Sequence, residues 1–312
     1  MGLKRKDILG LQEMSPDEIE TILETALSFK EILTRKVKKV PTLRGRSIIT
    51  LFFEPSTRTR TSFEMAGKIM SADVSSIAMA NSSVVKGECL KDTILTLQAM
   101  KPDLFIVRHQ ASGAPHFIAG MVKESVINAG DGMHEHPSQG LLDMLTIIEK
   151  KGRLDGLTVA IVGDILHSRV ARSNMWGLTK MGAKVRFVGP ETLIPSEAKN
   201  LPVEVYTNVE EGIKGADVVN VLRIQRERMT GGLLPSTREY SRLFGITKER
   251  LKLAKDNAIF MHPGPMNRGV EIMPDVADSD ISMVTEQVTN GVAVRMAMLY
   301  HLLGGTEDAV VA

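Results

Sequence analysis

The sequence has very little cysteine, few aromatic residues and no excess of charge of either sign. Its single cysteine, Cys89, cannot form an intrachain disulfide, and no Cys/His spacing of the structural zinc type is present. The 39 Lys and Arg residues nearly balance 37 Asp and Glu, and this net charge of +2 gives no support for nucleic-acid or membrane-surface binding. The absence of a disulfide framework favours a reducing compartment, so we expect a cytoplasmic protein.

Long apolar runs and targeting signals are also missing. No stretch approaches the ~18 consecutive apolar residues that a membrane span requires. The N-terminal residues 1–6 lack the apolar core of a signal peptide, and Lys6 stands where a myristoylation signal has Ser or Thr. We therefore expect neither export nor a membrane anchor.

The chain instead has the length and pattern of an α/β protein with two lobes. Its 312 residues, 43% of them apolar, are enough for two domains of ordinary size. Short apolar runs alternate with helix-like segments, a pattern that predicts two doubly wound lobes, each a parallel sheet flanked by helices. The predicted strands are 47–53, 104–107, 126–129, 159–162, 185–188, 218–222 and 259–261, and the main helices are 16–37, 61–70, 90–100, 141–149, 172–181 and 284–303.

The domain boundaries are predicted from two segments. One helix-like segment ends at Lys150-Lys151-Gly152, directly before a new strand, which places the lobe boundary within residues 134–156. The helical pattern of residues 284–303 is long enough to return to the first lobe. We predict a first domain of residues 1–139 plus 288–312 and a second of residues 140–287.

A strand-to-helix turn at residues 54–64 has the composition of an anion site. Hydroxyl side chains and Arg58 stand where a helix begins, and a helix N-terminus favours an anion such as phosphate. Arginine can bind two phosphate oxygens at once. The alternative interpretation is that Ser56 is only a helix cap and the arginines are surface charges. The turn lacks the glycine-lysine pattern of a nucleotide P-loop.

The same turn resembles the Ser-Thr-Arg-Thr signature of the aspartate and ornithine carbamoyltransferases. Further motifs follow in the order of that family and extend the resemblance over about the whole chain. They are Lys86-Gly87-Glu88, Val107-Arg108-His109, residues 128–132 with His136-Pro137-Ser138-Gln139, Val162-Gly163-Asp164 with Ser168-Arg169, residues 223–228, and His262-Pro263-Gly264-Pro265.

The resemblance implies a carbamoyl-phosphate-binding first domain and an aspartate-binding second domain, acting in pyrimidine biosynthesis without a cofactor or metal. The residues that it implies for carbamoyl phosphate are Ser56, Thr57, Arg58, Thr59, Arg108, His136, Gln139, Pro263 and Gly264. Those that it implies for L-aspartate are Lys86, Arg169, Arg223 and Gln225. The catalytic residues that it implies are Arg58, Thr59, Lys86, Arg108 and His136.

Aspartate, rather than ornithine, is the acceptor that the residues favour. The Ser-Met-Gly and His-Cys-Leu-Pro segments of the ornithine enzymes are absent, and Arg169 and Arg223 match the positions that hold the acceptor carboxylates in aspartate enzymes. The implied cations also suit two anionic reactants, whereas the ammonium group of ornithine would be repelled. An ornithine-type enzyme remains the alternative.

The loop that contains Lys86 bears on the oligomeric state that the resemblance implies. Its counterpart in the family reaches the active site of a neighbouring subunit, with Ser82 or Ser83 as the serine that contacts the substrate. The resemblance therefore implies a homotrimer with shared active sites. Dihydroorotase or regulatory chains are further partners found in the family.

The sequence admits three other interpretations. His134 and His136 could share a metal ion. The sequence shows no acidic or histidine partner set for them, so we expect no metal to be bound. Gly163 follows a strand as in a dinucleotide-binding fold, yet the remaining glycines of that motif are missing. The third is a catalytically silent assembly subunit. The complete set of candidate residues argues against it.

Overall fold

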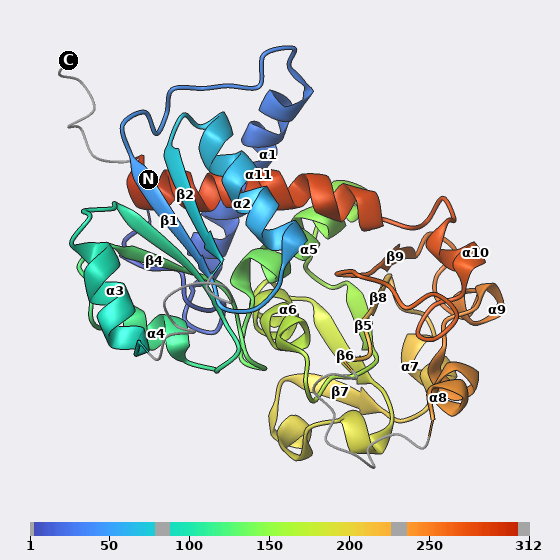
Figure 1. Ribbon diagram of the computed structural model, residues 1–312. Helices are drawn as coiled ribbons and strands as arrows, with labels where there is room; N and C mark the ends of the chain where they lie inside the picture. The colour runs from blue at the N-terminus through green and yellow to red at the C-terminus, as the bar shows by residue number, and fades with distance from the viewer. Residues whose placement is uncertain (1–2, 79–87, 226–235, 305–312) are drawn as a thin grey trace. The chain divides into compact units, whose positions relative to one another are not determined.

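The computed structural model describes residues 3–78, 88–225 and 236–304. The chain divides into two compact units, one formed by Met1–Leu141 with Thr289–Ala312 (unit 1) and the other by Leu142–Val288 (unit 2). Each unit has one parallel sheet flanked by helices, which confirms the predicted α/β class (Figure 1). Across the described residues, no helix has the length and apolar character needed to cross a membrane.

Unit 1 contains a four-stranded parallel sheet in the order β2–β1–β3–β4. Its strands are β1 (Ser47–Phe52), β2 (Asp73–Ala78), β3 (Leu104–His109) and β4 (Ser125–Asp131). Its helices are α1 (Pro16–Thr34), α2 (Thr57–Ile69), α3 (Leu90–Gln98), α4 (Ala114–Ala119) and the beginning of α5 (Pro137–Lys151). The chain moves from β1 to one neighbour, β2, and returns to the other, β3, so its direction across the sheet reverses there.

The last helix, α11 (Val284–Leu303), belongs to unit 1 from residue 289 onward. Its His301 Nε2 lies 2.8 Å from the hydroxyl of Thr25, and the rings of Tyr300 and Phe29 meet edge to face at 5.5 Å. Figure 1 shows α11 running beside α1 and α2. The predicted return of the C-terminal helix to the first lobe is confirmed.

Unit 2 contains a five-stranded parallel sheet in the order β7–β6–β5–β8–β9. Its strands are β5 (Thr158–Val162), β6 (Lys184–Val188), β7 (Val203–Tyr206), β8 (Val218–Val221) and β9 (Ile259–Met261). Its helices are α6 (Arg169–Lys180), α7 (Val209–Ile213), α8 (Thr237–Phe244), α9 (Lys248–Leu251) and α10 (Pro274–Ala277), with 3₁₀ turns at Glu191–Leu193 and Ser196–Asn200. The direction across this sheet reverses between β5 and β8.

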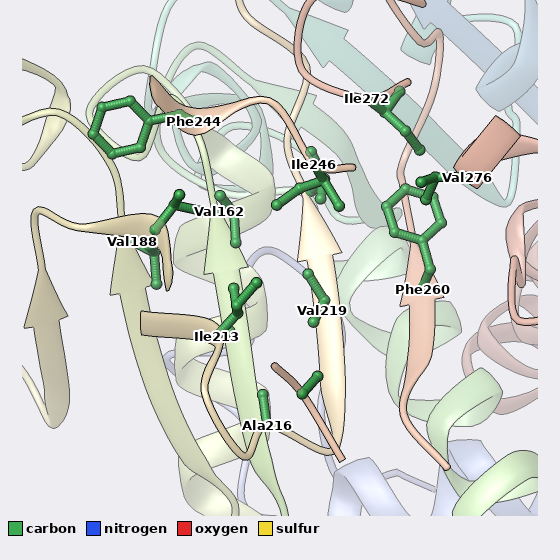
Figure 2. Close-up of a cluster of buried hydrophobic side chains, with 14 of the residues drawn as sticks. Val162, Val188, Ile213, Ala216, Val219, Phe244, Ile246, Phe260, Ile272 and Val276 are labelled. Atoms are coloured by element: carbon green, nitrogen blue, oxygen red, sulfur yellow. The ribbon is translucent and has the colours of Figure 1, made fainter. Parts of the chain in front are cut away.

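The core of unit 2 is built on the same strands that end at its candidate site. Val162, Val188, Val219 and Phe260 project from β5, β6, β8 and β9, and Ile213 from α7 packs onto them (Figure 2). All five residues are fully buried. Their burial fixes the strand ends, and with them the loops that carry the candidate residues.

Local signals explain where some elements begin. Ser15 caps α1: its hydroxyl accepts the Glu18 amide hydrogen while the Glu18 carboxylate accepts the Ser15 amide hydrogen. This capping box satisfies two amides that the helix leaves unpaired. The helix ends at Thr34, three residues before the predicted end at Val37.

Candidate active site

The candidate residues of unit 1 gather where the chain reverses between β1 and β3. Parallel α/β sheets bind ligands at such a point, at the carboxyl ends of the strands. Phe52 and Arg108 are paired in register, and the Phe53 amide donates to the Arg108 carbonyl over 2.9 Å. The turn from β1 into α2 therefore lies beside Arg108.

The signature residues form the first turn of α2. The sequence-based start of this helix, Thr61, is wrong because the helix begins at Thr57; its first residues, Thr-Arg-Thr-Arg-Thr-Ser, are all polar and hide the helical periodicity. Ser56 is the N-cap, but its hydroxyl makes no capping hydrogen bond. Thr59 is buried, while Thr57 and Arg58 are exposed. Backbone amides, hydroxyls and a guanidinium group thus share one helix N-terminus, an arrangement suited to phosphate.

Arg108 is held from two neighbouring strand ends. Its Nε lies 2.8 Å from Glu54 Oε1, in the turn after β1, and its Nη1 donates to the Ala129 carbonyl of β4 over 3.2 Å. Both charged side chains are largely buried. Sequence reasoning gave Glu54 no role, although its place directly after a strand, beside the signature, was an available signal.

His136 and Gln139 stand at the start of α5, and both side chains are buried. Nδ1 of His136 lies 3.5 Å from the Ser138 hydroxyl. Arg295 of α11 donates to Ser138 Oγ over 3.2 Å and to Ser62 Oγ over 3.1 Å, which links the beginning of α5 to α2. These bonds bring His136 and Gln139 to the same part of unit 1 as the α2 signature.

Arg295 itself was missed by the sequence analysis. It is a charged side chain within the apolar run of α11, and this isolation was the available signal. Burial lowers its pKa to about 10, because removal from water disfavours the charged form. Its guanidinium group also lies over the ring of Phe63, 5.0 Å from the centroid.

The candidate residues of unit 2 gather where the chain reverses between β5 and β8. Val162 and Val221 are paired in register, and the Leu222 amide donates to the Val162 carbonyl over 2.7 Å. Gly163 has a φ of +133°, and a side chain there would meet the Leu222 carbonyl oxygen at 3.1 Å. The loops that lead to Arg169 and Arg223 consequently run close together.

The two loops are also joined by side-chain bonds. Gln225 Nε2 donates to the His167 carbonyl over 3.4 Å, and His167 Nδ1 lies 2.9 Å from Asp164 Oδ1. Burial raises the pKa of Asp164, although hydrogen bonds from His167 and the Gln225 backbone act in the opposite direction. Arg169, the first residue of α6, is buried, and Arg223 is half-buried. Arg169, Arg223 and Gln225 thus all lie at this end of the unit 2 sheet.

Pro263 and Gly264 follow β9, the strand next to β8. The Gly264 amide donates to His262 Nδ1 over 2.8 Å, and the His262 amide donates to Gln287 Oε1 over 3.0 Å. Gln287 in turn donates to the buried carboxylate of Asp143 over 2.7 Å. This chain of bonds fixes the loop whose backbone carbonyls the sequence analysis selected.

Ser82, Ser83 and Lys86 lie outside the described residues. The metal interpretation of His134 with His136 needs correction, because His134 has acidic and histidine partners, Asp131 and His116. Asp131 lies only three residues before His134, but the set was not recognised because its third member, His116, comes from α4, far from the motif in sequence.

Comparison with known proteins places the chain in a family. A family profile described as "Aspartate/ornithine carbamoyltransferase, carbamoyl-P binding domain" matches residues 6–149, and one described as "Aspartate/ornithine carbamoyltransferase, Asp/Orn binding domain" matches residues 155–302. The chain belongs to the aspartate/ornithine carbamoyltransferase family. The first matched segment corresponds mainly to unit 1 and the second mainly to unit 2, but the second also includes residues 289–302, which belong to unit 1.

Members of this carbamoyltransferase family resemble the chain over nearly its full length. An aspartate carbamoyltransferase catalytic subunit of Moorella thermoacetica is 65% identical, over 98% of this chain and 99% of its own; one of Heliobacterium modesticaldum is 61% identical over the whole of both chains. Among solved structures, aspartate transcarbamoylase of Trypanosoma cruzi, in complex with N-(phosphonacetyl)-L-aspartic acid, has a TM-score of 0.87 at 29% identity, covering 96% of this chain and 97% of its own. Ornithine carbamoyltransferase of Pyrococcus furiosus also has a TM-score of 0.87, at 31% identity, covering 98% of this chain and all of its own.

Proposed function

We propose that this chain is an aspartate carbamoyltransferase. It transfers the carbamoyl group of carbamoyl phosphate to the amine of L-aspartate and releases N-carbamoyl-L-aspartate and phosphate, a step of pyrimidine biosynthesis. The observation that carries the choice of acceptor is the pair Arg169 and Arg223 at the reversal point of unit 2, because aspartate brings two carboxylates. Relatives at 57–65% identity are named for the aspartate reaction.

Unit 1 supplies the residues that we assign to carbamoyl phosphate. Ser56, Thr57, Arg58 and Thr59 bind the phosphate at the N-terminus of α2, where backbone amides and the helix dipole favour an anion. Arg108, near the end of β3, binds a phosphate oxygen and the carbamoyl oxygen. His136 donates to that same carbamoyl oxygen, and Gln139 binds the carbamoyl amide.

The chemistry follows from these donors. The aspartate amine attacks the carbamoyl carbon, and negative charge develops on the carbamoyl oxygen. The bond from the carbamoyl carbon to the phosphate oxygen then breaks, and the departing phosphate takes the proton that the amine loses. Thr59, Arg108 and His136 stabilise that charge, and preorganised donors of this kind contribute on the order of 3 kcal/mol each. No covalent intermediate is required, because orientation and charge stabilisation lower the barrier.

Unit 2 supplies the residues that we assign to L-aspartate. Arg169, Arg223 and Gln225 bind its two carboxylates, and the carbonyls of Pro263 and Gly264 hold the carbamoyl amide. An ornithine ammonium group would meet the same guanidinium groups and be repelled. The fold alone does not choose between the acceptors, since the ornithine enzyme of Pyrococcus furiosus matches it as well as the aspartate enzyme of Trypanosoma cruzi does.

Assembly is part of the proposal. Lys86, with Ser82 or Ser83, completes the site of a neighbouring subunit, so the active enzyme is a homotrimer with shared sites. Dihydroorotase and regulatory chains remain candidate partners, and a cytoplasmic location stays a prediction. Size-exclusion chromatography coupled to light scattering measures the mass directly; a fully active monomer would contradict the shared site.

A product assay tests the proposed reaction. Purified protein is incubated with carbamoyl phosphate and either L-aspartate or L-ornithine, and the ureido product is measured by colour development. We expect carbamoyl-aspartate from the wild-type chain and at least a hundredfold less from Arg58→Ala, which controls for contaminating enzyme. Citrulline as the main product, or no product at all, would refute the assignment.

A further inference from the structure

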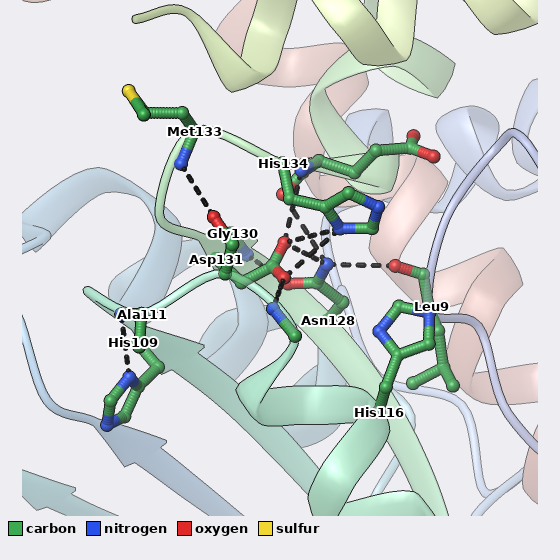
Figure 3. A network of polar contacts seen from close by, with 12 residues as sticks. Leu9, His109, Ala111, His116, Asn128, Gly130, Asp131, Met133 and His134 are labelled. Atoms are coloured by element: carbon green, nitrogen blue, oxygen red, sulfur yellow. Dashed lines mark hydrogen bonds and ion pairs between the residues drawn. The ribbon is translucent and has the colours of Figure 1, made fainter.

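Three side chains of unit 1 that the proposed reaction does not use gather at one place. His116 comes from α4, Asp131 ends β4, and His134 lies in the turn that follows. One potential ligand atom from each lies within 4.8 Å of the other two (Figure 3). Two imidazoles and a carboxylate are a donor set that binds divalent transition metals.

His116 is oriented as a metal ligand. Its Nε2 lies 3.1 Å from Glu13 Oε1, while its Nδ1 is buried and has no hydrogen-bond partner among the described residues. If Nε2 carries the proton shared with Glu13, the lone pair lies on Nδ1. Histidines that bind metals commonly donate their other ring N–H to a carboxylate, and Glu13 occupies that position.

Asp131 and His134 are fixed beside it. The Asp131 carboxylate is fully buried and accepts hydrogen bonds from Gly113 N at 2.7 Å and from Asn128 Nδ2 at 2.7 Å. His134 Nδ1 lies 3.1 Å from Asp131 Oδ2, and the rings of His134 and His116 are 5.4 Å apart. The three groups are thus held together before any ion binds, which lowers the cost of ordering them.

We propose that His116, Asp131 and His134 form a binding site for one divalent transition-metal ion of the Zn²⁺ type. Water completes the coordination, since the two histidines are partly exposed. The nitrogen donors select against Mg²⁺ and Ca²⁺, which prefer oxygen ligands. The site is independent of the proposed function, because none of its residues is assigned to a substrate.

The expected effect of the ion is to hold the turn between β4 and α5 in its folded conformation. That turn leads directly to His136, and its buried Glu135 accepts the amide hydrogens of Leu11 at 2.8 Å and Gln12 at 3.0 Å. An ion bound to His116 and His134 joins α4 to this turn. Metal binding therefore stabilises the folded state of the chain, because the unfolded chain lacks the assembled site.

Calorimetric titration of the metal-free, full-length protein tests the site. All variants carry Cys89→Ser, because the exposed thiol of Cys89 is a competing zinc ligand. We expect one Zn²⁺ per chain, no binding of Mg²⁺, and a melting temperature that rises with Zn²⁺. Bound Co²⁺ should show visible absorption bands of nitrogen and oxygen ligation.

Variants decide whether these residues are the ligands. We expect His116→Ala and His134→Ala to weaken Zn²⁺ binding at least ~100-fold and Glu13→Ala by about 10–100-fold, the range for partners of a ligand. His301→Ala, which changes a histidine of α11, should bind Zn²⁺ normally. If His116→Ala does not fold, His116→Gln replaces it. Unchanged affinity in the folded His116 and His134 variants, or no stoichiometric binding by the parent protein, would overturn the proposal.

Discussion

Arg108 and Glu54 form an ion pair across the ends of β3 and β1, with 2.8 Å between Nε and Oε1. The pair joins the two strand ends at which the chain reverses in unit 1. A guanidinium group held in this way meets its ligand without first losing side-chain freedom, which is how preorganised sites lower a barrier. Glu54 is therefore a positioning residue in our account, acting through Arg108.

Replacing Glu54 by glutamine tests this role. We expect Glu54→Gln to lower kcat by roughly tenfold, or about 1.4 kcal/mol in the barrier, because a neutral amide loses the ion pair that holds the Arg108 guanidinium group. The KM for aspartate should change little, since Glu54 and Arg108 belong to unit 1. Equal kcat values for Glu54→Gln and wild type would remove Glu54 from the account.

Two arginines of the same helix offer a matched comparison. Arg58→Ala should lower kcat/KM for carbamoyl phosphate by about 100-fold or more, which corresponds to the loss of about 3 kcal/mol of transition-state stabilisation. Arg60 lies on the same turn of α2 but pairs with Glu64 at 3.7 Å, so Arg60→Ala should retain most activity. Because Arg58 is exposed and the Arg60 side chain is 40% exposed, both variants should melt near the wild-type temperature. Similar losses in the two variants would show that the helix, rather than the Arg58 side chain, is what matters.

In unit 2, Arg223→Ala should act mainly on the acceptor. Loss of one carboxylate-binding guanidinium group should raise the KM for aspartate at least tenfold, while the KM for carbamoyl phosphate stays within about twofold. Arg242→Ala, at an exposed position of α8, is the control. Initial rates measured over a grid of both substrates separate the two constants. A selective rise in the KM for carbamoyl phosphate would contradict the assignment.

Asp131 gives a prediction about pH. Burial opposes its ionisation, but hydrogen bonds from His134, Gly113 and Asn128 outweigh this and hold its pKa below the usual value of 3.8. A carboxyl group with a lowered pKa in the folded state stabilises the protein above pH ~4, and this contribution disappears as pH falls below that value. With a chelator present, Asp131→Asn should lower the free energy of unfolding by about 2 kcal/mol at pH 7.

The pH dependence provides the check on that variant. The difference between Asp131→Asn and wild type should shrink in denaturant titrations as pH is lowered from 5 toward 3, because the Asp131 carboxylate of the unfolded chain takes up a proton near pH ~4, while that of the folded chain does so only at lower pH. A difference that stays constant over this range would mean that Asp131 contributes by shape and not by charge.

The sequence predicted the strands that are buried and apolar, including β4 and β9, which lie at the edges of the two sheets. The other two edge strands, β2 (Asp-Val-Ser-Ser-Ile-Ala) and β7 (Val-Glu-Val-Tyr), were missed, because they carry polar residues and lack a continuous apolar run. The short helix α4 was missed for a related reason, since six residues with a proline give too little periodicity to recognise.

The individual site residues were recognised through their motifs, while the contacts among them were not. Nothing in the local sequence around residue 295 indicates that this arginine reaches Ser62 and Ser138. The partnership of His116 with His134 likewise depends on how α4 packs beside β4. Such contacts are fixed by tertiary packing, which single-sequence patterns do not encode.

The choice of acceptor is tested most directly by competition in one reaction. Purified enzyme receives ¹³C-labelled carbamoyl phosphate with equal concentrations of L-aspartate and L-ornithine, and the carbonyl resonances of the products are followed by NMR. The account predicts carbamoyl-aspartate in at least ~100-fold excess over citrulline, because two guanidinium groups attract one acceptor's carboxylates and repel the other's ammonium. Comparable amounts of the two products, or citrulline alone, would contradict it.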